Sequence, residues 1–320
     1  MKKNLIIYNL TSRGLYSELF NLSLAIVYAR HKRLAIKVNT WLWNSRLNRG
    51  WLDFFEPTLE SSNNLFSAQD KVYTKEKPWI GKIYYKPKEF YSYYFRKVLN
   101  CIYCIIHPRV ILTKDIFDDM RSKYFIHTVL GDNAFTEMSS TFKDMYKLNK
   151  KTKDIIIDTI TKLQLPHEYI GIHIRRGDKI TSQEMASIHL DNYIIAILKY
   201  QNICKNIYIA TDDINCISYI KQKIANQHIN VYYNDLNQCQ GHNESQFNHA
   251  SRLFRYQETL NVLLDMEVLI HSKFFIGTYT SNLSRVVPFF LGLDNCMSLD
   301  NDWNIINSLN NEVFNHNNKL

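Results

Sequence analysis

Three clusters of polar and charged residues stand at the ends of short apolar runs in the second half of the chain. They cover residues 173–179, 211–213 and 278–282. In an open parallel sheet, ligands bind beyond the carboxyl ends of the strands, so these clusters are predicted to share one edge of a sheet. The first cluster contains Arg175 next to Arg176, and guanidinium groups donate paired hydrogen bonds to phosphate oxygens. The spacing therefore predicts a pyrophosphate site.

The other two clusters add further polar groups to the same predicted edge. The second cluster ends in Asp212 and Asp213. The third carries the hydroxyls of Thr280 and Ser281 and the amide of Asn282 at the start of a predicted helix, where backbone N–H groups can bind anions. We therefore expect a second anion site there.

The charged groups also have structural interpretations. Arg175 lies close to Asp178 in the sequence, so the two could form an ion pair, and His173 could be an ordinary hydrogen-bonded strand residue. Asp265 is harder to explain in this way because its predicted helix is otherwise apolar. An unpaired buried carboxylate is costly, so Asp265 is expected to have a partner from the protein or from a ligand.

Common nucleotide and metal motifs are missing from the sequence. It contains no P-loop, no G-x-G-x-x-G and no G-x-S-x-G, which removes the usual support for a kinase, a dinucleotide-binding enzyme or a serine hydrolase. The D-x-D at residues 300–302 follows the last strand that the pattern predicts, and Cys101 and Cys104 form a lone C-x-x-C. Neither is a complete metal site, so we expect no metal and no cofactor.

The elements that must position the clusters alternate between strand and helix. A strand at 5–8, a helix at 18–30 and a strand at 34–38 form a first β-α-β unit, whereas residues 61–125 show no such rhythm. One long helix is predicted at 139–163. After it, strands are predicted at 169–174, 206–210, 230–233 and 274–278, with helices at 191–200, 214–225 and 259–270 and from 283. This alternation predicts an α/β protein with a doubly wound parallel sheet.

Composition and charge narrow the class of protein further. Hydrophobic residues make up 46% of the 320 residues, while Gly (9) and Pro (6) are scarce, which excludes a disordered chain and argues against a turn-rich all-β fold. The net charge is +9, and residues 71–109 hold nine basic residues against two acidic ones, so an anionic partner is expected for this tyrosine-rich segment. No apolar run approaches a membrane span or a signal-peptide core, and the predicted location is the cytoplasm.

In order and spacing, these motifs resemble those of the α1,6-fucosyltransferase family, which includes core-fucosylation and nodulation enzymes and is related to α1,2- and protein O-fucosyltransferases. GIHIRRGDK at 171–179 is similar to the family's H-x-R-R-x-D-K block. IATDD at 209–213, LLD at 263–265 and FFIGTYTSNLSR at 274–285 resemble three further blocks. GLYSEL at 14–19 resembles part of the family's first domain.

The resemblance implies two Rossmann-like domains in a GT-B-like architecture. They are placed here at 1–160, an acceptor-side domain that includes the basic segment, and at 161–320, a GDP-sugar-binding domain. The resemblance also implies that His173 and Asp265 bind the guanine and that Arg175 binds the pyrophosphate. The predicted donor-binding residues are His173, Arg175, Arg176, Asp212, Asp213, Asp265, Thr280, Ser281 and Asn282.

The catalytic base is where this sequence departs from the family pattern. The family's catalytic glutamate corresponds to Gln183 without a gap and to Glu184 only with a gap. Glu184 and Asp178 therefore stay as alternatives for the base. The predicted catalytic residues are Arg175, Asp178, Lys179 and Glu184.

The function that follows is metal-independent, inverting transfer of fucose from GDP-fucose to a glycan hydroxyl. The alternatives are a non-catalytic nucleotide- or glycan-binding protein of the same fold and a transferase that uses another GDP-sugar. Nucleic acid is not an expected partner. The basic, tyrosine-rich segment suits peripheral contact with an anionic membrane and a lipid-linked glycan acceptor, while a solvated helix face is the plainer interpretation.

Overall fold

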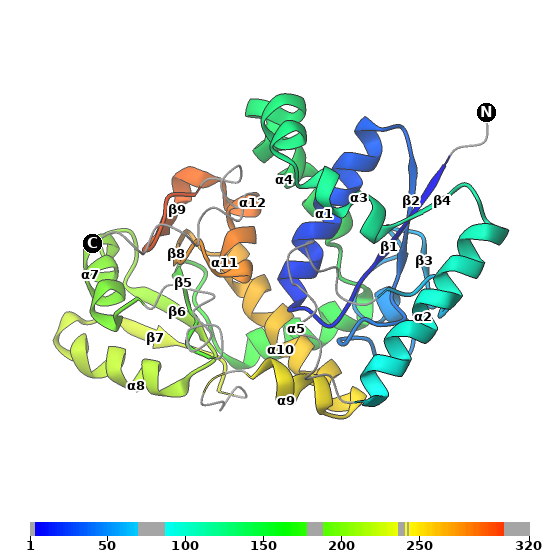
Figure 1. Cartoon of the computed structure of the whole chain (residues 1–320). Coiled ribbons are helices and arrows are strands. Elements are labelled where there is room, and N and C mark those ends of the chain that lie inside the picture. Colours follow the sequence, from blue (N-terminus) through cyan, green and yellow to red (C-terminus); the bar gives the residue numbers. More distant parts are fainter. Residues whose placement is uncertain (1–3, 70–86, 178–187, 236–240, 242, 304–320) are drawn as a thin grey trace. The chain divides into compact units, whose positions relative to one another are not determined.

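The computed structural model of the chain describes residues 4–69, 87–177, 188–235, 241 and 243–303, with only the backbone described at 87–93. The chain forms two compact α/β units, Met1–Asn149 and Lys150–Leu320, which we call unit 1 and unit 2 (Figure 1). Their boundary precedes the one predicted at residue 160. The difference arises because the helix from Lys150 to Lys162 packs against a helix of unit 2.

Unit 1 is built on a four-stranded parallel sheet with the strand order β3-β2-β1-β4. Its elements are β1 (Leu5–Asn9), α1 (Leu15–His31), β2 (Ala35–Asn39), η1 (Gly50–Asp53), β3 (Ser61–Ser62), α2 (Pro87–Ile106), β4 (Val110–Leu112), α3 (Thr113–Met120), η3 (Tyr124–Leu130), η4 (Gly131–Asn133) and α4 (Ala134–Met145). The predicted first β-α-β unit is present as β1, α1 and β2.

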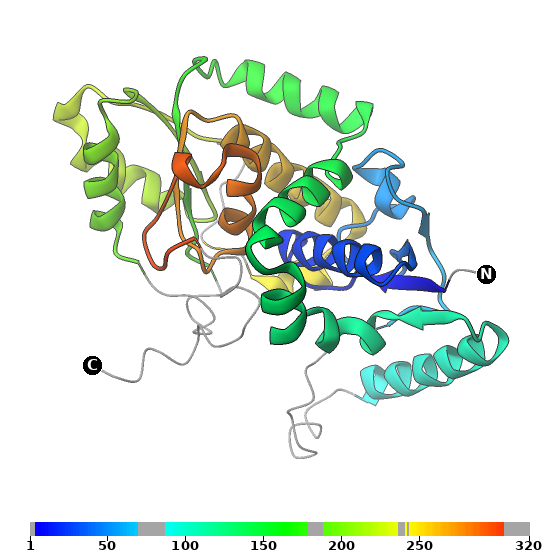
Figure 2. The same cartoon turned by 90° about the horizontal axis from the view of Figure 1, so that it is seen from above.

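Helix α1 forms the centre of the unit 1 core. Every residue from 19 to 29 is buried, and the helix packs against α3 and α4. Helix α2 lies on the opposite face of the sheet from α1 (Figure 2). A dense aromatic cluster of Trp43, Trp51, Phe54 and Phe55 fills the region that follows β2.

The single helix predicted at 139–163 is wrong, because the chain breaks it into α4 and α5 (Lys150–Lys162). Between them, Leu148 forms a bridge to Phe55, and the backbone N–H of Asn149 donates to the carbonyl of Phe54. Leu148 is buried in this bridge, so the apolar spacing continues through a segment that is not helical. A prediction from apolar periodicity alone therefore treats these two helices as one.

Unit 2 carries a five-stranded parallel sheet with the strand order β7-β6-β5-β8-β9. Its elements after α5 are β5 (Ile170–Ile174), α7 (Leu190–Tyr200), β6 (Asn206–Thr211), α8 (Ile214–Lys223), η5 (Ala225–Gln227), β7 (Asn230–Tyr232), α9 (Glu244–His249), α10 (Arg252–Ile270), β8 (Phe274–Gly277), α11 (Asn282–Val286), α12 (Pro288–Leu291), η6 (Leu293–Asn295) and β9 (Cys296–Ser298). The predicted doubly wound parallel sheet is confirmed.

The two faces of the unit 2 sheet differ in what they bury. Ile170, Ile172 and Ile174 of β5 point to one face, where they pack with side chains of α7 and α8. The residues between them, Gly171 and His173, point to the other face, because successive strand residues alternate. That second face is covered by α10, and Figure 1 shows α7 and α8 on the opposite side of the sheet from α10.

Both sheets contain a point where the strand order reverses. In unit 1 the chain winds outward from β1 through β2 to β3 and then returns to place β4 on the other side of β1. In unit 2 it winds from β5 through β6 to β7 and returns to place β8 beside β5. Such a switch point opens a crevice beyond the strand ends, where ligands bind in open α/β sheets.

Candidate active site

His173 stands at the switch point of unit 2. It belongs to β5, and its Nδ1 lies 2.7 Å from the Oγ of Ser284, which belongs to α11 after β8. Burial and the nearby charge of Arg175 together lower the pKa of His173 to about 4, against the opposing effect of Asp212. At neutral pH the ring is therefore an uncharged hydrogen-bonding group, which suits a nucleobase better than a phosphate.

Arg175 follows β5 directly and is fixed by a carboxylate from the next strand. Its Nη1 lies 2.9 Å from Oδ2 of Asp212, and both side chains are largely buried. Asp212 also accepts the backbone N–H groups of Arg176 at 2.7 Å and Gly177 at 2.8 Å. This carboxylate thus sets the conformation of the loop after β5 and the direction of the Arg175 guanidinium.

Gly241 lies against this loop. The backbone N–H of Gly241 donates to the carbonyl of Asp212 at 2.7 Å. Gly241 has a φ of +98°, and a Cβ placed on it would lie 3.3 Å from the Cα of Gly177. Both the positive φ and the close approach favour glycine at position 241.

The two adjacent arginines lie in different surroundings. The charge of Arg176 acts on Tyr193 of α7 and Cys216 of α8, on the face of the sheet opposite α10. Burial raises the pKa of the Cys216 thiol, and the nearby charge of Arg176 opposes the rise. That both guanidinium groups bind one pyrophosphate stays a prediction.

Asp300 organises the loop after β8 in the same way that Asp212 organises the loop after β5. Its carboxylate accepts the backbone N–H of Tyr279 at 2.6 Å and that of Thr280 at 3.0 Å, and it also accepts the Thr280 hydroxyl. The sequence pattern predicts its last strand at 274–278, but the structure adds β9, which ends at Ser298 and delivers Asp300 to the strand-end edge. Sequence reasoning missed this role because β9 is three residues long and half-buried.

The second anion site expected around residues 280–282 is not supported. Both donors of Thr280 bond to Asp300, and the N–H of Ser281 donates to the carbonyl of Thr278. Helix α11 spans only five residues, too short to build a strong dipole. Asn282 accepts a long 3.5 Å bond from Arg285, so this loop holds itself in shape with its own donors.

Asp213 is a helix cap in this structure. Its side chain accepts the backbone N–H of Asn215 at 3.0 Å and forms the N-cap of α8. Capping explains an aspartate at this position without any ligand.

Asp265 has the protein partner that its burial requires. The hydroxyl of Tyr208 donates to Oδ1 of Asp265 at 2.7 Å, and both residues are buried. Burial raises the pKa of Asp265 to about 7, against the opposing effect of the Tyr208 bond. Tyr208 and Ala210 share one face of β6, and Ala210 pairs with His173. The carboxyl of Asp265 and the ring of His173 therefore belong to the same face of the sheet.

Three of the predicted catalytic residues, Asp178, Lys179 and Glu184, lie outside the described residues, as does Gln183. Within the part of the chain that the structure describes, no three His, Cys, Asp or Glu side chains come together as a metal site. Cys101 and Cys104 are both free thiols on α2. Among the described helices, none combines the length and the apolar character that crossing a bilayer requires.

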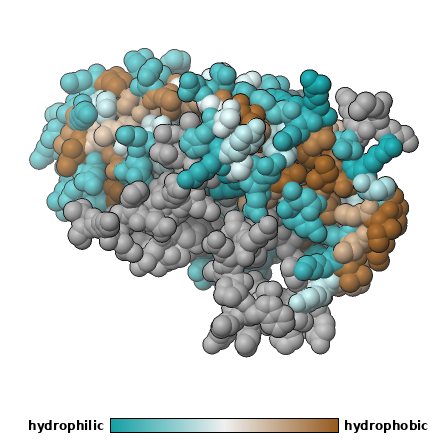
Figure 3. Space-filling model, turned by 45° about the horizontal axis from the view of Figure 1, so that its top comes forward, coloured by the Kyte–Doolittle hydropathy of each residue, from teal (hydrophilic) through white to brown (hydrophobic). Residues whose placement is uncertain are grey.

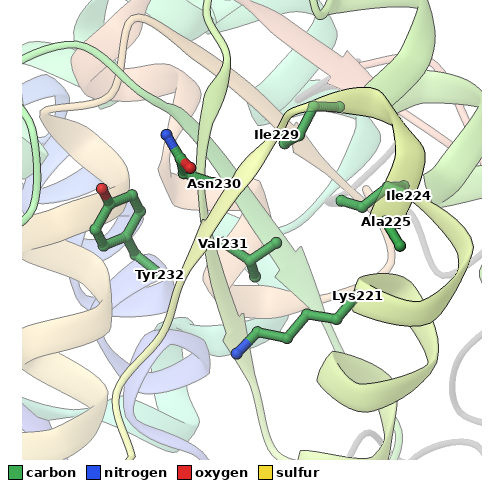
Figure 4. A pocket seen from close by; sticks show the side chains of 7 residues that line it. All are labelled: Lys221, Ile224, Ala225, Ile229, Asn230, Val231 and Tyr232. Atoms are coloured by element: carbon green, nitrogen blue, oxygen red, sulfur yellow. The ribbon is translucent and has the colours of Figure 1, made fainter.

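A hollow of about 410 Å³ lies elsewhere in unit 2, at the edge strand β7 (Figure 4). Its walls come from β7 and from the end of α8, and Lys221 is the one charged side chain among its lining residues. Asn230 pairs with Asn206 at the amino end of the sheet, away from the switch point. Without paired titratable groups, this hollow is a poor candidate for chemistry.

Solved structures share this fold at low sequence identity. NodZ from Bradyrhizobium is 15% identical, with 91% of this chain and 94% of NodZ covered and a TM-score of 0.52. POFUT1 in complex with GDP is 10% identical, with 93% and 98% covered and a TM-score of 0.54. Arabidopsis thaliana FUT1 in complex with GDP is 12% identical, with 91% and 69% covered and a TM-score of 0.51. These similarities establish the fold class as α/β and GT-B-like, as predicted.

The family is established by the sequence match. Residues 21–291 match the family described as alpha-(1,6)-fucosyltransferase N- and catalytic domains. This match spans most of the chain, including His173 and Arg175 at the end of β5 and Asp265 on α10. The chain belongs to the α-1,6-fucosyltransferase family and is a glycosyltransferase.

Proposed function

We propose that this protein transfers fucose from GDP-fucose to a hydroxyl of a glycan, with inversion at the anomeric carbon and without a metal ion. Family membership supports the reaction class. Solved structures of the same fold support the donor, because NodZ was soaked with GDP-fucose and POFUT1 was crystallised in complex with it. The observation that carries the proposal is the ion pair of Arg175 with Asp212 at the switch point of unit 2.

Arg175 is the residue best placed to stabilise the leaving group. As the acceptor oxygen bonds to C1 of fucose, the bond from C1 to the pyrophosphate oxygen breaks and negative charge develops on GDP. A guanidinium held in place before the reaction stabilises that charge without reorganising, which is an effective form of electrostatic catalysis. Asp212 provides this fixation by holding both the guanidinium and the loop backbone.

His173 and Asp265 form the proposed guanine end of the site. Guanine presents N–H donors at N1 and N2, which a carboxylate can accept in pairs. The raised pKa of Asp265 places its ionisation near neutrality in the free protein, and two donors from the base would favour the ionised form. The neutral ring of His173 supplies an uncharged hydrogen-bonding partner on the same face.

The acceptor proton must pass to a base, and a carboxylate in this role contributes about 10² to 10⁴-fold to the rate. Glu184 and Asp178 stay the two candidates by sequence, with Lys179 as a further catalytic residue. The metal-independent mechanism is part of the proposal, with Arg175 in the place where other transferases use a divalent cation. A cytoplasmic location also stays a prediction.

The decisive experiment incubates the purified protein with GDP-fucose and a panel of glycan acceptors, with and without EDTA, and determines the product linkage by NMR. We expect a single new fucosyl linkage that forms equally well with EDTA. Activity that chelation removes and Mn²⁺ or Mg²⁺ restores would contradict the metal-independent mechanism. Transfer from another GDP-sugar, with none from GDP-fucose, would contradict the proposed donor.

A further inference from the structure

Helix α2 of unit 1 exposes an apolar face. Six of its large apolar side chains are between 43% and 78% exposed, namely Tyr94, Phe95, Val98, Ile102, Ile105 and Ile106. Their spacing places them along one side of the helix. Figure 3 shows hydrophobic side chains gathered along this outer edge of unit 1. A contiguous exposed apolar surface of this kind marks an interaction site.

The opposite side of the helix fixes this orientation. Leu99 and Asn100 are buried, and the Asn100 amide donates to the carbonyls of Phe66 at 2.9 Å and Ala68 at 3.0 Å. These bonds join α2 to the chain that follows β3. The helix therefore cannot rotate to bury its apolar face without breaking the two hydrogen bonds that the buried Asn100 amide donates.

The charge of the segment indicates what covers this face. Residues 71–109 hold nine basic residues against two acidic ones, and within this range Lys97 and Arg109 are exposed on and just after α2. An amphipathic helix with aromatic and aliphatic side chains on its outer face and basic residues beside it binds at the interface of a bilayer. Anionic lipids add attraction for each Lys or Arg near the surface.

We propose that the apolar face of α2 docks on an anionic lipid bilayer, with Ile102, Ile105 and Ile106 entering the interface and Lys97 and Arg109 at the level of the headgroups. A second copy of this chain fits less well, because a symmetric contact through this face would bring Lys97 and Arg109 of one copy close to those of the other. The docking does not depend on fucosyl transfer. If the proposed function also holds, docking would bring the enzyme to a glycan carried on a lipid.

Vesicle flotation at low and high salt tests the docking directly. The full-length protein is mixed with phosphatidylcholine vesicles, with or without phosphatidylglycerol. We expect flotation only with phosphatidylglycerol and weaker flotation at high salt. The double variant Ile105→Glu with Ile106→Glu should lower the partition coefficient by on the order of tenfold or more, since it places charge on the inserted face. Replacing Lys97 and Arg109 by glutamine should lower it about fivefold for each residue.

The matched control is Ile195→Glu on α7 of unit 2, where the side chain is 64% exposed outside the proposed surface. It should float like the unchanged protein, and circular dichroism should show that all variants are folded. Wild-type protein that ignores anionic vesicles at low salt, or a double variant that floats normally, would overturn the proposal. So would a wild-type dimer that Ile105→Glu converts to a monomer without any vesicle binding. Transfer to a water-soluble acceptor, measured without vesicles, tests the proposed function separately.

Discussion

In each unit, a hydrogen bond to a side chain links the strand at the switch point to the chain that follows its returning neighbour strand. The groups around these two bonds differ between the units. In unit 1 the backbone N–H of Asn9, at the end of β1, donates to the hydroxyl of Thr113, which follows β4. In unit 2 His173 of β5 is bonded to Ser284, which follows β8. Each bond joins the central strand to the chain that returns on its other side.

Around these bonds, unit 1 uses neutral amides and one buried carboxylate. The side-chain oxygen of Asn9 accepts the amide of Asn39 at 3.0 Å and the backbone N–H of Gln69 at 3.3 Å. The buried carboxylate of Glu18 lies on α1 and accepts the hydroxyl of Thr11. In unit 2 the corresponding strand ends carry the ion pair of Arg175 and Asp212.

This difference indicates which of the two sets of strand ends suits the proposed reaction. Neutral amides that satisfy one another stabilise a sheet edge, and they offer little to a phosphate or to a developing charge. Charged groups with shifted pKa values are expensive to maintain, and they concentrate at functional sites. The two units thus share a framework, and the strand ends of unit 2 are the ones that suit the proposed anionic donor.

The largest expected effect is that of Arg175→Ala. Removing the guanidinium from the proposed leaving-group position should lower the transfer rate by about 10² to 10³-fold, as the loss of a preorganised charge stabiliser does in other enzymes. The fold should be retained, because Arg175 lies at the strand end and not in the core. Initial rates and GDP titrations measure the effect.

Arg30→Ala in unit 1 is the matched control, since this arginine donates to Thr141 at a partly exposed position. It should leave both rate and GDP affinity unchanged. Unchanged turnover and GDP affinity in Arg175→Ala would remove the pyrophosphate role.

Asp265→Asn makes the buried acid of unit 2 resemble the neutral network of unit 1. The folded-state pKa of Asp265, about 7, lies above its ordinary value of 3.8, so between these pH values the folded protein holds more protons than the unfolded one. Titration of Asp265 therefore lowers the free energy of unfolding of the unchanged protein as pH rises from about 4 to 7. The decrease is on the order of 3 to 4 kcal/mol. The asparagine variant lacks this loss.

We therefore expect Asp265→Asn to gain stability relative to the unchanged protein as pH rises, with GDP affinity about tenfold lower because a charged acceptor is lost. Urea unfolding at several pH values and GDP titration measure the two quantities. The titration of His173 is common to both proteins and cancels in the difference. A stability difference that does not vary with pH would show that Asp265 is ionised throughout.

Asp212→Asn should lower the transfer rate about tenfold, because the amide keeps an acceptor for the loop but loses the charge that orients Arg175. Its neighbour provides a close control. Asp213→Asn should leave activity and stability unchanged, since asparagine caps a helix as well as aspartate does. Equal losses in the two variants would mean that the whole turn, and not the ion pair, matters. Steady-state kinetics of both variants distinguish these outcomes.

The smallest effect on GDP affinity is expected for a substitution in unit 1. Asn9→Ala removes the acceptor of the Gln69 N–H and one of the acceptors of the Asn39 amide, which should cost about 1 to 3 kcal/mol of unfolding free energy. GDP affinity should not change. Asn4→Ala, at an exposed position before the same strand, should change neither quantity. A loss of GDP affinity in Asn9→Ala alone would show that unit 1 contributes to the donor site.

The sequence predicted the central strands well because they are buried on both faces. Continuous apolar runs such as that of β5 are typical of parallel sheets and leave little room for another interpretation. β9 is short and half-buried, so it gave no such signal, and Asp300 was placed outside the sheet.

Partners that depend on packing could not be predicted. The apolar helix indicated that Asp265 needed a partner, but Tyr208 became that partner only because α10 crosses the sheet at β6. The break between α4 and α5 depended on pairing with residues 54–56, which are distant in sequence. Such contacts belong to the three-dimensional fold and leave no local pattern.

The strand order of unit 2 also has a consequence for folding. β5 pairs with β6 nearby in the chain, but its other neighbour is β8, where Ile170 pairs with Phe274. Contacts over such long sequence separations close large loops, and they slow folding. During synthesis, β5 leaves the ribosome well before β8, so one edge of this apolar strand stays without its partner until most of the unit has been made. Premature pairing of that edge with another chain is a characteristic route to misfolding.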